Sequence, residues 1–113
     1  MVKIGIGAQK LVFSSLKPGV AAKEVFEKYW KFLVDKDYTD YFLYGPCHGT
    51  GVMECEHPFL ESDSDYILKE DMTFQVDIFL GDDEFGLRFE DGALITPSGA
   101  DIFINDYREV IEI

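Results

Sequence analysis

The feature that most constrains the fold is a pair of segments, residues 72–80 and 85–90, in which apolar and polar residues alternate. The apolar positions of the two segments are Met72, Phe74, Val76, Ile78, Leu80, Phe85, Leu87 and Phe89. Successive side chains of a β-strand point to opposite faces, so a period of two predicts half-buried strands. Residues 81–84, Gly-Asp-Asp-Glu, are typical of a turn and predict that the two strands form an antiparallel hairpin.

The register of this hairpin decides which polar side chains meet. Folding the hairpin about Asp83 places Asp77 opposite Glu90, and a shift of two residues places Asp77 opposite Arg88. In both registers these three residues share the face away from the apolar positions. Cross-strand Cβ atoms lie about 4.5–5.5 Å apart, and two carboxylates at that spacing repel unless a cation or a proton lies between them. A solvated face with an Arg88 salt bridge and a cation site are both open at this point.

The first third of the chain predicts two helices. Residues 2–16 have helical spacing of apolar positions in spite of Gly5 and Gly7, and residues 20–34 carry a clear amphipathic stripe. Lys-Pro-Gly at 17–19 separates them, because the residue before proline avoids the helical region. A last hairpin is expected from strands 93–96 and 102–104. Helices followed by strands predict an α+β domain, with two helices packed on one face of a curved antiparallel sheet.

The middle of the chain is less regular. We expect a strand or irregular structure at residues 38–44, a glycine-rich turn at 45–51, and a loop with a short helical turn at 57–71. His48 lies in the glycine-rich segment, and imidazole beside carboxylates is a common ligand set for zinc, manganese or iron. The alternative is a histidine that is hydrogen-bonded within a turn. For Cys55 a small buried thiol is favoured over a ligand of a soft metal.

The totals narrow the classes of function. The length of 113 residues predicts a single domain, 1–113. Twenty-two acidic against ten basic residues give a net charge of -12, which argues against nucleic acid and anionic membranes as partners. The chain contains neither an apolar run of membrane-spanning length nor the apolar core of a signal peptide, so we expect a cytoplasmic location with Cys47 and Cys55 reduced.

Four blocks carry a resemblance to a known family. They are Lys-Pro-Gly-Val at 17–20, His-Gly-Thr-Gly at 48–51 with Glu56 and Pro58, KEDMTFQVD at 69–77, and GLRFED at 86–91 with Ile95, Thr96 and Gly99. In this order they resemble motifs of the pita-bread metallopeptidases, the family of Xaa-Pro dipeptidase, aminopeptidase P, methionine aminopeptidase and the non-metal relative creatinase. The resemblance covers most of the chain and implies the C-terminal half of a pita-bread fold.

The resemblance also implies roles for individual residues. His48 and Glu90 match metal ligands of the family, Asp77 stands where the family has a ligand glutamate, and Arg88 would support the neighbouring carboxylates. The implied cofactor is a divalent metal such as manganese, cobalt or zinc, and the implied activity is hydrolysis of a peptide bond by metal-activated water.

Three departures from the family's pattern bear on activity. The family's two aspartate ligands precede the Lys-Pro-Gly-Val turn, whereas residues 1–16 contain no Asp, Glu or His. Cys55 stands at the position of the family's second histidine, where we expect it to be non-functional. Asp77 is one methylene shorter than glutamate. The metal set of His48, Asp77 and Glu90 is therefore incomplete, and a site with no metal bound is also open.

Two classes of function follow. The first is a fragment or diverged relative of an Xaa-Pro-type metallopeptidase that is inactive alone, and the alternative is a non-catalytic binding or interaction module. A weaker enzyme alternative is a one-metal site of His48, Asp77 and Glu90 with Cys55 as a fourth ligand. The expected partners are a peptide or small-molecule substrate and a homodimer or complementary half-chain, because an uncovered sheet edge tends to find a partner.

Overall fold

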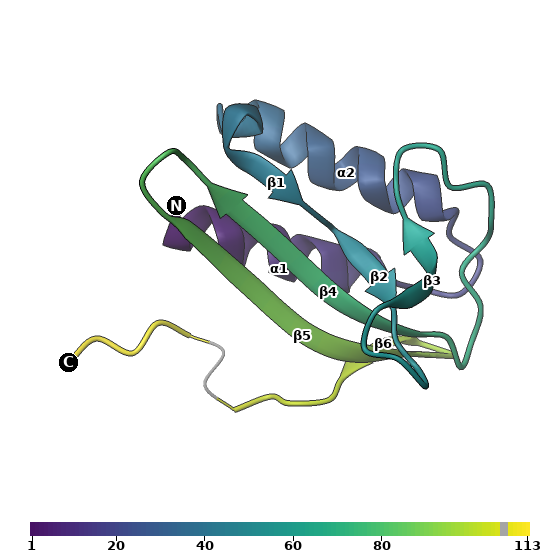
Figure 1. The fold of residues 1–113 in the computed structure, drawn as a ribbon. Helices are drawn as coiled ribbons and strands as arrows, with labels where there is room; N and C mark the ends of the chain where they lie inside the picture. Colours follow the sequence, from purple (N-terminus) through teal and green to yellow (C-terminus); the bar gives the residue numbers. More distant parts are fainter. Residues whose placement is uncertain (107–108) are drawn as a thin grey trace.

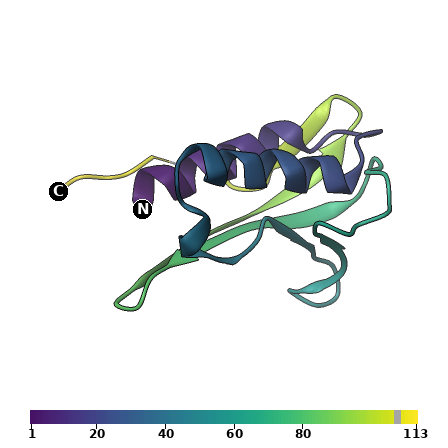
Figure 2. The same cartoon turned by 90° about the horizontal axis from the view of Figure 1, so that it is seen from above.

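Two helices, α1 (Val2–Ser15) and α2 (Ala22–Asp35), lie side by side on one face of an antiparallel sheet in the computed structural model, which describes residues 1–106 and 109–113 (Figures 1 and 2). The remaining elements are η1 (Thr39–Tyr41), β1 (Phe42–Tyr44), β2 (Cys47–Gly49), β3 (Glu56–Leu60), β4 (Thr73–Gly81), β5 (Gly86–Thr96) and β6 (Gly99–Ile102). This two-layer arrangement confirms the predicted α+β fold. No helix in the described part of the chain is long and apolar enough to cross a membrane.

The core lies between the helices and one face of β4. Phe74, Val76, Ile78 and Leu80 have no exposed surface, and neither have the residues at the centre of the α2 stripe, Val25, Tyr29 and Leu33. Burying the apolar face of an amphipathic helix on the apolar face of a sheet removes both from water, which is the main favourable term in folding. The predicted alternation thus sends one set of β4 side chains into the core and leaves the other set on the far face.

The strand order is β3-β2-β4-β5-β6, and β1 pairs with β4 beside β2. β1 and β2 follow one another along the same edge of β4, with Gly45 and Pro46 between them (Figure 1). The backbone N–H of Asp77 donates to the Pro46 carbonyl oxygen at 2.9 Å. This bond joins β4 to the two residues between β1 and β2, so Asp77 lies opposite the break between these short strands.

The prediction of a glycine-rich turn at residues 45–51 is wrong for its central part. Cys47–Gly49 is a buried strand between β3 and β4. Gly45 has φ of 132°, and a Cβ there would lie 2.7 Å from the Asp77 carbonyl oxygen. A Cβ on Gly49 would lie 2.8 Å from the carbonyl oxygens of Glu56 and His57. These glycines therefore permit a close backbone approach between strands. Turns also favour glycine, so the same sequence pattern is compatible with either structure.

The prediction for residues 57–71 is also wrong in part. Glu56–Leu60 forms β3, which contains Pro58 and lies at the edge of the sheet, where proline is tolerated. Residues 61–71 form turns and an isolated bridge between Ile67 and Ala21 in place of the helical turn. The last hairpin is present, although β6 ends at Ile102.

Gly5 allows α1 to approach β5 closely. A Cβ at this position would overlap a ring carbon of Phe89, whereas a Cβ on Gly7 would lie 3.1 Å from the tip of the Phe32 ring. The first separation is far inside van der Waals contact, and the second needs only a small shift. The Phe89 ring therefore occupies the space that any side chain at position 5 would need.

We predict opposite effects of the same change at these two helix positions. Alanine for glycine normally favours a helix by about 1 kcal/mol, but overpacking against Phe89 costs about 1–3 kcal/mol. Gly5→Ala should therefore lower the free energy of unfolding, and Gly7→Ala should leave it unchanged or raise it. Urea denaturation of both variants measures this, and a Gly5→Ala protein more stable than the parent would contradict the packing described here.

Candidate metal centre

His48 lies on β2 between two neighbouring strands, and only 1% of its side chain is exposed. Its Nδ1 atom is 2.9 Å from the carbonyl oxygen of Gly49. A carbonyl oxygen only accepts hydrogen bonds, so Nδ1 of the neutral ring carries the proton and donates it. The lone pair of Nε2 is then free, and this buried atom has no hydrogen-bond partner. Buried polar atoms are nearly always paired, so Nε2 has the features of a ligand atom.

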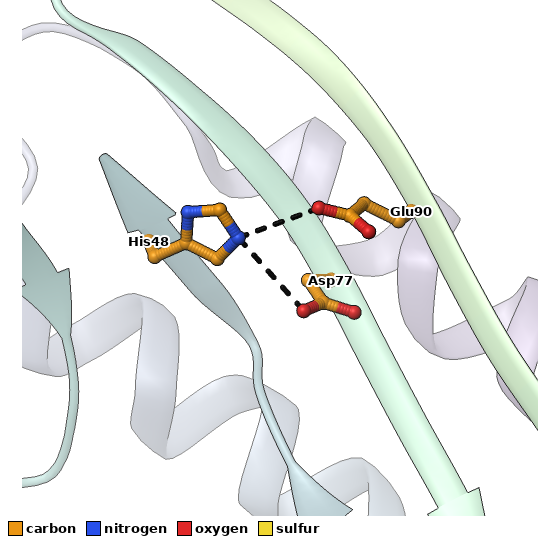
Figure 3. Close-up of side chains that lie close together, drawn as sticks. All are labelled: His48, Asp77 and Glu90. Carbon is orange, nitrogen blue, oxygen red and sulfur yellow. Dashed lines mark ion pairs between the residues drawn. The ribbon is translucent and has the colours of Figure 1, made fainter. Parts of the chain in front are cut away.

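Two carboxylates face this nitrogen (Figure 3). His48 Nε2 is 3.4 Å from Glu90 Oε1 and 3.8 Å from Asp77 Oδ2, and one ligand atom from each residue falls within a group of 4.8 Å. Asp77 and Glu90 are direct cross-strand partners on β4 and β5, so the structure selects the first of the two predicted registers. Donors about 2.1 Å from one divalent cation lie roughly 3–3.5 Å apart, so His48 and Glu90 have the spacing of two ligands of one cation, whereas Asp77 lies farther from the ring. The imidazole and carboxylate chemistry of the set also fits such a cation.

Arg88 binds the buried carboxylate of the cluster. Its Nε donates to Asp77 Oδ1 at 2.8 Å, and its Nη2 donates to Asp77 Oδ2 in a bidentate pair. The Asp77 side chain has no exposed surface, whereas 51% of the Arg88 side chain is exposed. The bond to Asp77 raises the pKa of the Arg88 guanidinium above its usual value. The predicted Arg88 salt bridge is therefore present beside the candidate ligand group, although the Asp77 partner is buried and not on a solvated face.

The charge of Glu90 is only partly compensated. Its Oε2 is 3.5 Å from Arg88 Nε, which favours ionisation. Burial, a hydrogen bond with Glu54 and the charge of Asp77 outweigh this and raise the pKa of Glu90 above its usual value. A positive charge placed among these groups would lower their mutual repulsion.

The patterns in the sequence do not point to Glu54 as a site residue. This residue lies in the segment that joins the antiparallel strands β2 and β3, and its Oε1 is 3.7 Å from His48 Nε2. A connection between adjacent antiparallel strands stays near both of them. That proximity would indicate Glu54 as a neighbour of His48, but the glycine-rich sequence of residues 45–51 is typical of a turn and conceals β2.

Cys55 lines a cleft beside the ligand group. The cleft has a volume of about 590 Å³ and is lined by Leu43, Tyr44, His48, Cys55, Phe59, Phe79 and Arg88. Cys55 is exposed and Cys47 is buried, and both thiols are free, so the interpretation of Cys55 as a buried thiol is wrong. Burial, together with the neighbouring Cys55 and Asp77, raises the pKa of Tyr44 to about 12. The cleft is thus bordered by aromatic rings and open to solvent at Cys55.

Comparison with known proteins gives a consistent result. Residues 2–97 match metallopeptidase family M24. The chain is 31% identical over 110 residues to Xaa-Pro dipeptidase from Pyrococcus furiosus, covering 96% of this chain and 32% of that protein. The crystal structure of the prolidase from Pyrococcus horikoshii superposes with a TM-score of 0.89 at 30% identity, covering 96% and 32% of the two chains.

A third relative extends the likeness to another peptidase type. The X-Pro aminopeptidase from Thermotoga maritima superposes with a TM-score of 0.86 at 26% identity, covering 95% of this chain and 31% of that one. The present chain therefore spans about a third of the length of the relatives it matches.

The Asp77–Arg88 pair yields a stability prediction. Arg88→Met leaves a fully buried carboxylate without its cation, a change that costs about 3–5 kcal/mol where both partners are buried. Solvent around the exposed part of Arg88 reduces the cost, so we expect roughly 2 kcal/mol. Adding Asp77→Asn removes the orphaned charge and should restore part of the loss. Chemical denaturation tests both proteins, and a double variant no more stable than Arg88→Met would contradict the pairing.

The raised pKa of Glu90 yields a second prediction, which concerns pH. The folded chain holds the Glu90 proton more tightly than the unfolded chain, where the pKa is about 4.3. The stability that protonated Glu90 contributes is therefore lost as pH rises from the pKa of the unfolded chain through the pKa of the folded chain. In metal-free buffer, Glu90→Gln should unfold at a higher temperature than the parent near pH 7, and the difference should vanish near pH 3.5. A variant less stable than the parent at neutral pH would contradict this electrostatic account.

Proposed function

The chain belongs to metallopeptidase family M24, and we propose that it forms a divalent-cation-binding part of an Xaa-Pro-type peptidase site that does not hydrolyse peptides by itself. The observation that carries the proposal is the unpaired, buried Nε2 of His48 facing Glu90 and Asp77. A stability-driven core would be expected to pair this atom or replace the ring.

Each residue has a distinct part in this site. When bound, a divalent cation would supply Lewis-acid polarisation of a peptide carbonyl and lower the pKa of water. His48 would donate the Nε2 lone pair, held in place by its Nδ1–H bond to Gly49. Glu90 would contribute an anionic oxygen. Arg88 would hold the Asp77 carboxylate in one orientation through its two bonds. We propose manganese, cobalt or zinc, all of which accept imidazole and carboxylate ligands.

The number of ligands argues against hydrolysis by these residues alone. A two-metal site needs several anionic ligands, and this group offers one imidazole and two carboxylates, one of them already paired with Arg88. Cys55 also stands where the resemblance implies a second histidine. A thiol is a weak donor, and losing a donor to a developing oxyanion costs roughly 3–4 kcal/mol of transition-state stabilisation.

The cleft supports a peptide or a small apolar molecule as the bound partner. Leu43, Phe59 and Phe79 offer apolar contacts beside His48, and Arg88 offers a positive charge at the same wall. The net charge of -12 disfavours nucleic acid as a ligand. We also propose that the chain associates, either with a second copy or with a complementary chain, and acts in the cytoplasm, where its free thiols would remain reduced.

A second candidate function is that of a non-catalytic binding module. It is favoured by two substitutions at the site itself, Cys55 and Asp77, together with the capture of Asp77 by Arg88. In this candidate the cleft binds a ligand without turning it over. It differs from the first candidate in needing no cation.

We predict the outcome of a turnover assay. The purified chain, supplied with manganese, cobalt or zinc, should not hydrolyse a dipeptide ending in proline above the rate of buffer with metal, because too few anionic ligands surround the cation. The same protein should bind the metal in equilibrium dialysis, which separates the first candidate from the metal-free module.

The Glu90→Gln variant provides the control for this assay. It should lose metal binding and match the parent in showing no turnover. Metal-dependent hydrolysis by the parent that disappears in Glu90→Gln would overturn the proposed inactivity and make the chain a working peptidase.

A further inference from the structure

The connection between β2 and β3 brings a third carboxylate to His48. Glu54 Oε1 lies 3.7 Å from His48 Nε2, which places it between the distances of Glu90 and Asp77 from the same atom. We propose that Glu54 is a metal ligand and that His48, Glu54 and Glu90 form a one-metal site within this chain, with Asp77 held by Arg88 as a neutral pair. This inference rests on the proposed cation site and names the ligand that completes it.

The buried nitrogen distinguishes this cluster from an ordinary group of surface acids. His48 Nε2 is buried and unpaired, and the three carboxylates lie around it at 3.4, 3.7 and 3.8 Å. Glu54 Oε1 and Glu90 Oε1 both lie within 3.7 Å of this one nitrogen, so oxygens from the β2–β3 connection and from β5 meet beside the ring. An acceptor that lacks a donor and is surrounded by further acceptors can be satisfied only by a cation or a shared proton.

The charges favour Glu54 as a direct ligand. Asp77 and Arg88 form a bidentate pair and cancel one another, and an imidazole that binds a cation through Nε2 adds no charge of its own. Glu90 alone leaves a divalent cation with one uncompensated positive charge. Glu54 supplies the second negative charge, so the set of one imidazole and two free carboxylates balances one divalent cation.

The backbone of the connection presents Glu54 to the site. The Gly51 N–H donates to the Met53 carbonyl oxygen at 3.1 Å, and the Met53 N–H donates to Glu56 Oε2 at 3.0 Å. Glu56 is therefore engaged within its own turn. Cys55 lines the cleft together with Tyr44. Of the acidic side chains in this connection, Glu54 is the one directed at His48.

Exposure makes Glu54 a suitable position for a clean test. Its side chain is 67% exposed, so Glu54→Gln keeps the size of the residue and should leave the fold intact. Glu84→Gln is a matched control, because Glu84 is an exposed glutamate in the turn between β4 and β5. Glu90→Gln removes a ligand on which the proposed function itself depends.

The experiment is calorimetric titration of the full chain with Mn²⁺ and with Co²⁺, together with the visible absorption of the Co²⁺ form. The parent and Glu84→Gln should bind one equivalent with equal affinity. Changes to groups that only support ligands cost about 10–100-fold in metal affinity, so Glu54→Gln should weaken binding at least tenfold and alter the Co²⁺ spectrum. Glu90→Gln should weaken it at least as much.

The outcomes separate this inference from the proposed function. If Glu54→Gln binds like the parent while Glu90→Gln loses binding, Glu54 is not a ligand and the proposed cation site stands without it. If the parent binds neither metal, the proposed cation site itself is wrong, and the inference falls with it.

Discussion

β4 and β5 pair from Thr73 opposite Leu94 to Gly81 opposite Gly86, and this register positions both halves of the molecule. On one face of β4 the side chains from Phe74 to Leu80 meet the helices and form the core. On the other face the same register sets Asp77 opposite Glu90. A slip of one residue would exchange the two faces, exposing the core residues and burying the polar set. The burial of the core therefore also stabilises the arrangement of the site.

The site combines one satisfied charge with one unsatisfied lone pair. Arg88 compensates Asp77, which is why a carboxylate with no exposed surface is tolerated on a strand. His48 donates to Gly49 through Nδ1. Its Nε2 is then a hydrogen-bond acceptor whose neighbours, the carboxylates of the cluster, also only accept hydrogen bonds. The shorter side chain of Asp77, compared with the glutamate that the family resemblance implies, accompanies its capture by Arg88. Asp77 then contributes orientation to the cluster, and the negative charge available to a cation comes from Glu90 and Glu54.

Elements with a regular spacing of apolar residues can be predicted from the sequence. The period of two in residues 72–80 and 85–90 predicted the hairpin and its polar face, and the stripe in residues 20–34 predicted α2. The errors arose where one residue type serves two purposes. Gly45 and Gly49 permit close strand approach, but glycine is also typical of turns. The sequence pattern therefore indicates neither β2 nor the position of Glu54 beside His48. The exposure of Cys55 depends on the connection between β2 and β3, whose course no periodic pattern in the sequence encodes.

The proposed metal site depends on which nitrogen of the His48 ring carries the proton, and long-range ¹H–¹⁵N NMR correlation of the histidine side chains measures this directly. In metal-free protein at neutral pH, His48 should be the neutral Nδ1–H tautomer with an unprotonated Nε2. On addition of Zn²⁺, the Nε2 resonance of His48 should shift while the Nδ1 proton is retained and His57 stays unchanged. An Nε2–H tautomer of His48, or a His48 ring that does not respond to Zn²⁺, would contradict the claim that this nitrogen is the centre of a metal site.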